Sequence, residues 1–284
     1  MSAKGVCVAI GLNRVDTRAP AYTDVTMPVL AGCINDAESI AGLCESLGYQ
    51  PATVLIDGQA TRKAVLDALT AAATILEYGD TLVFSYSGHG MLGSFAEGAD
   101  PNDATCTSWI LYDQPLADFE LAARWPMFKR GVRIIVLSDS CHSGSATRQI
   151  SPSRQRNKGL HTSQREQVLK NCAAKFKRRP KKLRDLAPGA GIVLISSCTD
   201  SETSLDSTDE SGKPHGLFTA ALLKVWAFGK WTGDLMHFVE AVRVETSARS
   251  QATDPGHSQT PQFFPTGDVL VCIQIARSKP PFQP

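Results

Sequence analysis

Two short apolar runs in this chain each lead into a polar cluster that carries a reactive side chain. The run Ile134–Leu137 is followed four residues later by Cys141, and the run Leu82–Phe84 is followed five residues later by His89. Short branched apolar runs bounded by polar residues are typical of strands buried in a parallel sheet. A thiol and an imidazole at the ends of two such strands would form a nucleophile–base pair.

Nucleophilic attack on a carbonyl carbon requires Cys141 as a thiolate, whereas an unperturbed cysteine is mostly protonated at neutral pH. His89 would take that proton and later give it to a leaving amine. Gly88 and Gly90 leave room for a substrate backbone, and the N–H groups of Gly90 and Cys141 would form an oxyanion hole. The alternative is a buried structural thiol and an unrelated loop histidine. The presence of both polar clusters, each at the end of a predicted strand, favours catalysis.

The order of elements along the chain predicts how these strand ends come together. Strand and helix patterns alternate, which indicates βαβ units and an α/β domain with a mostly parallel sheet. Such sheets place catalytic groups at the carboxyl ends of their strands. The predicted strands are Val6–Leu12, Ala52–Ile56, Thr81–Phe84, Ile134–Leu137, Gly191–Ser196 and Val269–Ile273. The predicted helices are Asn35–Gly48 with Asn35 as cap, one following Thr61, Leu116–Trp125, Leu217–Trp226 and Gly233–Thr246, with an edge hairpin at Trp109–Tyr112.

The two polar clusters resemble the motifs of a known family. Ser87-Gly88-His89-Gly90 and Asp139-Ser140-Cys141-His142-Ser143-Gly144 resemble the histidine and cysteine motifs of metacaspases, the caspase-like cysteine peptidases. His89 precedes Cys141 by 52 residues, and the corresponding separation in caspases is about 50. Further segments that resemble this family are Gly32–Ala37, Ile195–Asp200, Thr203-Ser204, Gly216–Thr219 and Pro261-Gln262.

The resemblance implies a caspase-like three-layer α/β sandwich, with a sheet of about six strands and helices on both faces. It implies one peptidase domain over residues 1–284, made of a large-subunit-like region 1–144, a basic loop 145–190 and a small-subunit-like region 191–284. We expect no prodomain, because the first strand begins at about residue 6.

The resemblance also implies a substrate pocket. In that family, residues at the positions of Asp36 and Asp139 bind a basic side chain, and those of Cys33 and Ser87 complete the pocket wall. Two carboxylates in one pocket bind Arg or Lys and repel Asp. The chain is therefore expected to cleave after Arg or Lys. The alternative is that Asp36 caps a helix and Asp139 stabilises a turn.

A basic segment follows the predicted nucleophile. Residues 145–190 contain 13 Lys or Arg and 2 acidic residues, a net charge of +11, which leaves −10 on the rest of the chain. A long segment without a sustained hydrophobic period indicates a loop. We expect self-cleavage in this loop, or its insertion into the acidic pocket as an inhibitor, with an upstream protease as another activator. The candidate cleavage sites are Arg148, Arg154, Arg156, Lys158, Arg178 and Arg179. A nucleic-acid-binding tract is an alternative, disfavoured because Phe176 is the single aromatic residue of the segment, and a plain solvated linker is another.

Calcium is a cofactor of many metacaspases, and this chain departs from their pattern. Asp103, Asp118 and Glu120 match some of the family's calcium ligands, but Phe119 separates the last two and Arg148 occupies the position after the cysteine. A cationic side chain does not suit a cation site. We therefore expect no cofactor, with weak or absent calcium dependence.

The composition limits the remaining possibilities. With 284 residues, 43% hydrophobic and 20% charged, the chain has an ordinary globular composition. No apolar run approaches the length of about 20 residues that spans a bilayer, and no signal peptide is recognisable. Eight scattered cysteines without C-x-x-C pairs predict free thiols, no zinc site and a cytosolic location. The sequence thus predicts a cysteine endopeptidase; the alternative is a catalytically silent scaffold that binds a protein or nucleic acid through the basic loop.

Overall fold

The computed structural model describes residues 3–94, 105–141, 158–177, 189–199 and 202–284. At its centre is a six-stranded sheet in the order β11-β8-β7-β3-β1-β2. Five of these strands run parallel, and β11 at one edge is antiparallel to β8. The predicted α/β class and mostly parallel sheet are confirmed. The strands are β1 (Gly5–Gly11), β2 (Thr53–Ile56), β3 (Thr81–Ser87), β7 (Arg133–Asp139), β8 (Gly191–Ser196) and β11 (Gln262–Gly267).

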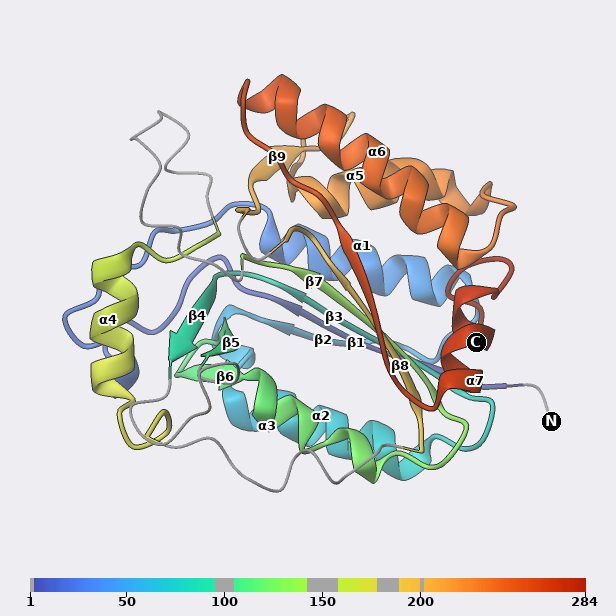
Figure 1. Ribbon diagram of the computed structural model, residues 1–284, viewed down its shortest axis with the longest axis horizontal. Coiled ribbons are helices and arrows are strands. Elements are labelled where there is room, and N and C mark those ends of the chain that lie inside the picture. Colours follow the sequence, from blue (N-terminus) through green and yellow to red (C-terminus); the bar gives the residue numbers. More distant parts are fainter. Residues whose placement is uncertain (1–2, 95–104, 142–157, 178–188, 200–201) are drawn as a thin grey trace.

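Helices cover both faces of this sheet (Figure 1). One face carries α1, α5 and α6, and the other carries α2 and α3, while α4 lies beside β4 and α7 beside β8. The α2 helix begins where the sequence predicts, because the side-chain oxygen of Thr61 accepts a hydrogen bond from Ala64 N. The helices are α1 (Cys33–Ser46), α2 (Arg62–Ile75), α3 (Asp118–Ala122), α4 (Thr162–Asn171), α5 (Leu217–Trp226), α6 (Leu235–Thr253) and α7 (Val269–Ala276).

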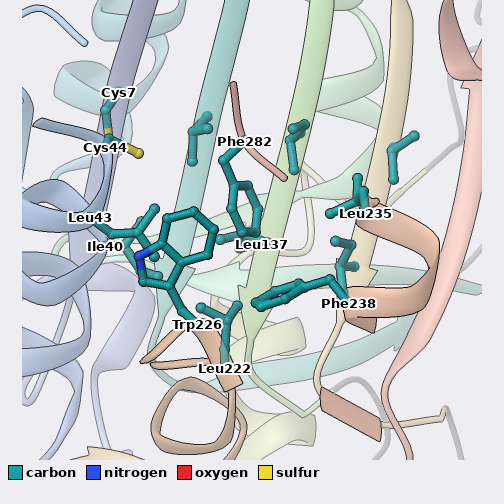
Figure 2. Packing of buried hydrophobic residues seen from close by; sticks show 14 of the residues in the cluster. Cys7, Ile40, Leu43, Cys44, Leu137, Leu222, Trp226, Leu235, Phe238 and Phe282 are labelled. Atoms are coloured by element: carbon teal, nitrogen blue, oxygen red, sulfur yellow. The ribbon is translucent and has the colours of Figure 1, made fainter. Parts of the chain in front are cut away.

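Each face of the sheet buries a separate apolar core. Figure 2 shows the core under α1, α5 and α6, where Trp226 and Phe238 pack near Phe282 from the C-terminal segment. The rings of Phe238 and Phe282 meet edge to face with centroids 5.5 Å apart. The second core lies between the sheet and α2. Strand β3 is buried along its whole length and β7 from Ile134 onward, because both strands contribute to both cores.

Two smaller sheets flank the carboxyl edge of the main sheet. The strands β4 (Gly90–Ser94), β5 (Thr105–Ile110) and β6 (Pro115–Ala117) form an antiparallel sheet, so the predicted edge hairpin lies outside the main sheet. The strands β9 (Asp206–Thr208) and β10 (Pro214–Gly216) form a short hairpin directly before α5. Residues of this hairpin reach the N-terminal turns of α1.

Several predicted elements are wrong in detail. Val269–Ile273 forms the start of α7 rather than a strand, because Asp268 accepts hydrogen bonds from the first free N–H groups of a helix. The last strand is β11 instead. The helix predicted at Leu116–Trp125 is only the five-residue α3, preceded by β6. Asn35 lies inside α1 and donates to Pro214 O, so it is not the cap.

The basic segment is also not a plain loop. Residues Thr162–Asn171 form α4, which packs on the chain near Tyr22 through Val168 and Asn171. The pattern was missed because α4 buries only Val168 fully and has few apolar residues to reveal a period. Within the described part of the chain, no helix is both long and apolar enough to cross a membrane. All eight cysteines are free thiols.

Candidate active site

Strand register brings the two predicted catalytic residues together. Ser87 at the end of β3 is the direct partner of Asp139 at the end of β7. His89 and Cys141 each follow two residues later, so both emerge at the same point of the carboxyl edge. The backbones are in close contact there: a Cβ atom on Gly90 would lie 1.8 Å from Cys141 O. Only glycine fits at this position.

Cys141 is completely buried, and its sulfur contacts the backbone of Ser204. Ser204 N donates to the sulfur at 2.7 Å, and the thiol points to Ser204 O at 3.4 Å. Burial and the neighbouring Cys198 raise the pKa of the Cys141 thiol well above its ordinary value, although Ser204 and Lys158 act in the opposite direction. Cys141 is therefore a neutral thiol in this conformation, and it needs a base to become nucleophilic.

Both nitrogens of the His89 ring lie against carbonyl oxygens. Nε2 is 2.8 Å from Pro28 O, and Nδ1 is 3.0 Å from Lys158 O. Burial lowers the pKa of His89 below its ordinary value, and it outweighs the two carbonyl groups, which raise it. A neutral ring that donates through Nε2 to Pro28 O presents Nδ1 as the basic nitrogen. A neutral ring has one N–H and can donate to only one of the two carbonyl groups, so the contact with Pro28 O orients the ring beside the Lys158 carbonyl group.

The four residues predicted to form the pocket, Cys33, Asp36, Ser87 and Asp139, are all buried and lie together, and we call their site the acidic pocket. Both Asp36 oxygens accept from Gly216 N at 3.0 Å, and Oδ2 also accepts from Ser87 Oγ at 2.6 Å. Asp139 Oδ2 accepts from Thr219 N at 3.0 Å and from Thr219 Oγ1 at 2.8 Å, at the start of α5. Cys33, the first residue of α1, is fully buried, and the charge on Lys158 lowers the pKa of its thiol against the larger, raising effect of burial.

Lys158 from the basic segment fills this pocket. Its Nζ atom lies 2.9 Å from Asp139 Oδ1, 2.9 Å from Ser87 Oγ and 3.5 Å from Asp36 Oδ2, and its exposure is 0%. Burial lowers the pKa of Lys158, but the surrounding carboxylates outweigh it, and the net pKa is well above the ordinary value. The same lysine holds the pKa of Asp36 below its ordinary value in spite of burial. The pocket therefore contains a buried, paired ammonium group.

The backbone of Lys158 is held as firmly as its side chain. Lys158 N donates to Ser204 O at 3.0 Å, and Lys158 O accepts from Gly90 N at 3.0 Å. Gly159 forms a bridge to Gly90 in the parallel sense. The carbonyl group of Lys158 thus lies at His89 and at one N–H of the predicted oxyanion hole.

Sequence reasoning missed the residues of the β9–β10 hairpin that complete the pocket. His215 Nδ1 is 2.8 Å from Asp36 Oδ1, and Asp206 Oδ1 is 3.9 Å from Lys158 Nζ. Ser204, just before this hairpin, donates to Asp139 Oδ1 at 2.7 Å. The hairpin residues are buried polar side chains in a segment without a hydrophobic period. Their only signal was the general resemblance of the flanking segments to metacaspases.

The structure describes only some of the remaining predicted site residues. Of the six candidate cleavage sites only Lys158 lies in the described part; Arg148, Arg154, Arg156, Arg178 and Arg179 lie outside the described residues, as does Asp103. The two described calcium candidates contact other groups of the chain. Glu120 pairs with Arg62 and with Lys175, and Asp118 Oδ2 accepts from Thr107 N at 3.0 Å. No group of three or more His, Cys, Asp or Glu residues that could hold a metal occurs among the described residues.

Comparisons with known proteins identify the family and the fold of the chain. The family profile described as caspase domain matches residues 4–267. A solved structure of a Geobacter sulfurreducens protein is similar, with 31% identity, a TM-score of 0.76 and coverage of 98% of both chains. Caspase-1 from Spodoptera frugiperda is 14% identical with a TM-score of 0.56, covering 93% of this chain and 86% of that one. The fold is therefore caspase-like.

Two curated relatives are metacaspases. Metacaspase-1 from Mycosarcoma maydis is 28% identical over 247 residues, which cover 69% of this chain and 58% of the relative. Metacaspase-4 from Arabidopsis thaliana is 32% identical over 151 residues, covering 48% of this chain and 33% of the relative. The chain thus spans between one third and about three fifths of the length of these relatives.

Proposed function

Because the chain belongs to the caspase-domain family, we propose that it is a cysteine endopeptidase that cleaves after Lys or Arg. Cys141 is the nucleophile and His89 the general acid–base. The observation that carries the proposal is Lys158, whose side chain fills the acidic pocket while its carbonyl oxygen meets Gly90 N and His89 Nδ1. The Lys158–Gly159 bond is then the first substrate of the enzyme.

The reaction follows from the positions of these groups. His89 Nδ1 takes the proton of the Cys141 thiol, and the sulfur bonds to the Lys158 carbonyl carbon. The negative charge that develops on the oxygen is stabilised by Gly90 N–H and, we propose, by Cys141 N–H. His89 then protonates the amine of Gly159 as the C–N bond breaks. A water molecule, deprotonated by His89, hydrolyses the thioester and restores the thiol.

The acidic pocket supports specificity for basic residues in the same way. Asp36 and Asp139 are both held by hydrogen bonds from neighbouring N–H and O–H groups, so they cannot swing away from the pocket. Two fixed carboxylates bind a cation and repel an acidic side chain. While Lys158 occupies the pocket, it excludes other substrates, and the intact chain is a zymogen. We also propose that another protease can cleave the basic segment at the other candidate sites, which are Arg148, Arg154, Arg156, Arg178 and Arg179.

The experiment follows the fate of the Lys158–Gly159 bond. The purified chain is incubated and examined by intact mass and denaturing gel, and we expect fragments that end at Lys158 and begin at Gly159. Cys141→Ala should abolish the cut. Lys158→Met should remove it, whereas the matched control Lys170→Met, an exposed lysine of α4, should leave it unchanged. The first-order rate should not depend on protein concentration if the cut is intramolecular.

Hydrolysis of added peptides tests the specificity. Fluorogenic peptides ending in Arg or Lys should be turned over, and the matching Asp peptide should not. Turnover after Asp would refute the pocket assignment. If Lys158→Met, with its pocket emptied of lysine, hydrolyses none of the peptides, the chain is a silent scaffold. We further propose that rates are the same with calcium and with a chelator, since Glu120 is already paired with cations.

The setting of the enzyme is also part of the proposal. Eight free thiols suit a reducing compartment, and we place the protein in the cytosol. Its partners are protein substrates with exposed Arg or Lys residues. The chain acts as a single peptidase domain, in which residues 1–144 and 191–284 correspond to large and small subunits.

A further inference from the structure

We propose that Asp206 is a third acidic residue of the pocket and makes it prefer arginine to lysine. This inference rests on the proposed function and concerns the specificity of the same site. Asp206 lies in β9, is 6% exposed, and places Oδ1 3.9 Å from Lys158 Nζ. Its other oxygen, Oδ2, accepts from Ala31 N at 3.0 Å, which fixes the direction of the carboxylate.

The three carboxylates around Lys158 differ in whether each of their oxygens accepts a hydrogen bond. The oxygens of Asp36 and Asp139 accept hydrogen bonds from His215, Gly216, Ser87, Ser204 and Thr219. Asp206 Oδ1, in contrast, is a buried oxygen without a hydrogen-bond partner in the described structure. A buried acceptor that lacks a donor costs free energy. Such an atom facing a ligand pocket indicates that the preferred ligand supplies the missing donor.

A lysine cannot supply that donor. An ammonium group has three hydrogens, and Lys158 Nζ already has three acceptors within 3.2 Å: Asp139 Oδ1, Ser87 Oγ and Asp139 O. The remaining distance to Asp206 Oδ1 is 3.9 Å, too long for a hydrogen bond. The charge attraction remains, but the directional contact is missing.

An arginine can supply it. A guanidinium group is longer than an ammonium group and carries five N–H donors in a planar fork. Reaching Asp206 Oδ1 requires a donor about 1 Å closer than Lys158 Nζ, which would give a charge-assisted hydrogen bond of the usual length. The pKa of Asp206 is raised, first by burial and further by Asp36 and Asp139, against the lowering effect of Lys158. A substrate cation is therefore the group that compensates its burial.

The resident lysine is then the weaker of the two ligands that the pocket accepts. An internal residue that leaves one pocket oxygen unsatisfied is easier to displace after cleavage than an arginine would be. External substrates with arginine gain the contact that Lys158 lacks. Arginine preference and release of the internal lysine thus have the same origin in Asp206.

The first test uses two peptides that differ only in Arg or Lys before the scissile bond. The wild-type kcat/KM should favour Arg, and Asp206→Asn should reduce the Arg value by about 10- to 100-fold, the loss of one charge-assisted hydrogen bond, and the Lys value much less. Asp206→Glu, one methylene longer, should instead improve Lys relative to Arg. The matched control Glu210→Gln removes a charge from the exposed turn of the same hairpin and should keep the wild-type ratio. Equal losses for both peptides in Asp206→Asn would overturn the inference.

The second test does not depend on activity. In the inactive Cys141→Ala chain, Lys158→Arg places the longer side chain in the pocket, and we expect its unfolding temperature to rise by about 3 °C or more. The rise in unfolding temperature should disappear when the chain also carries Asp206→Asn, and it should persist when the chain carries Glu210→Gln instead. A Lys158→Arg chain that is no more stable, or equally stabilised without the Asp206 charge, would contradict the inference. An enzyme that hydrolyses no peptide but shows this coupling would refute the proposed function alone.

Discussion

At Gly216 the wall of the acidic pocket consists of backbone atoms, with no side chain. A Cβ atom there would lie 2.2 Å from Asp139 Oδ2 and 2.2 Å from Lys158 Nζ. The same residue donates its N–H to Asp36, so backbone and pocket cannot move apart freely. A single methyl group at this position would compete for the space that the bound cation needs.

Gly216→Ala should therefore reduce hydrolysis of Arg and Lys peptides by about 10-fold or more, mainly through KM, because the cation is displaced from both carboxylates. The measurement is steady-state kinetics, with circular dichroism to verify the fold. Gly42→Ala, in α1 with nothing within 4 Å of the added atom, is the matched control and should retain full activity. Normal KM in Gly216→Ala would contradict this account of the pocket.

The buried, neutral His89 makes stability depend on pH. Its pKa is lowered by burial, so between pH 6.5 and the folded pKa the unfolded chain binds more protons than the folded chain. Stability from this residue is complete above pH 6.5 and falls as the pH decreases, by at most about 1.4 kcal/mol per pH unit. Both chains in this test carry Cys141→Ala. From about pH 7.5 to about pH 5.5, the free energy of unfolding should fall less in the chain with His89→Gln than in the chain that keeps His89, as measured by urea unfolding. An identical loss in both chains would contradict a neutral His89.

The catalytic and pocket residues differ in how far the sequence predicts them. Strand periodicity places His89 and Cys141 at the same edge of the sheet, whereas the resemblance to metacaspases adds Asp36 and Asp139 to the pocket. Asp206 lies in a three-residue strand, and such short pieces have no pattern. Its position beside Lys158 results from the folding of β9 and β10 across the start of α1, a long-range contact that local sequence does not specify.

Among the elements, the C-terminal pair β11 and α7 shows where local patterns are ambiguous. The apolar run in Val269–Ile273 suits a strand or a buried helix equally well. The cap decides: Asp268 Oδ1 accepts from Leu270 N at 2.9 Å and from Val271 N at 3.2 Å. Its position is set by the preceding strand, since Asp268 N donates to Ala190 O at the start of β8. The central strands were predicted because burial on both faces makes them continuous apolar runs.

Asp268→Ala should consequently destabilise the protein by about 1 kcal/mol, the usual effect of losing a helix cap. Urea unfolding provides the measurement. The control is Asp67→Ala on α2, whose carboxylate pairs with Lys63 at an exposed position, where the expected loss is below about 0.5 kcal/mol. If the two substitutions cost the same, the cap does not determine the helical state of Val269–Ile273.

For the whole molecule, the segments before and after the Lys158–Gly159 bond fold together into one sheet and one core. Strand β7 lies on one side of the bond and β8 on the other, yet the two are hydrogen-bonded neighbours from Arg133 to Ser138. The apolar core in Figure 2 likewise combines residues from both sides, such as Leu137 and Trp226. Cleavage removes no backbone pairing of the central sheet.

The two products, residues 1–158 and 159–284, should therefore remain one particle after self-cleavage. Size-exclusion chromatography in native buffer should give a single peak near 30.5 kDa that contains both fragments, and denaturant should be needed to separate them. The uncut Cys141→Ala chain is the reference for the elution volume. Fragments that elute separately without denaturant would show that the intact bond holds the sheet together.

Under the proposed function, Lys158 also competes with external substrates for the acidic pocket. Lys158 is joined to the pocket by its own chain, 17 positions after Cys141. A ligand on so short a tether acts at a local concentration in the millimolar range, whatever the concentration of the protein. If Lys158 blocks the pocket as proposed, a free protein substrate in the micromolar range competes poorly with it. Under the proposed function, the rate of the cut at Lys158–Gly159, which does not depend on dilution, therefore determines when other proteins gain access to the acidic pocket.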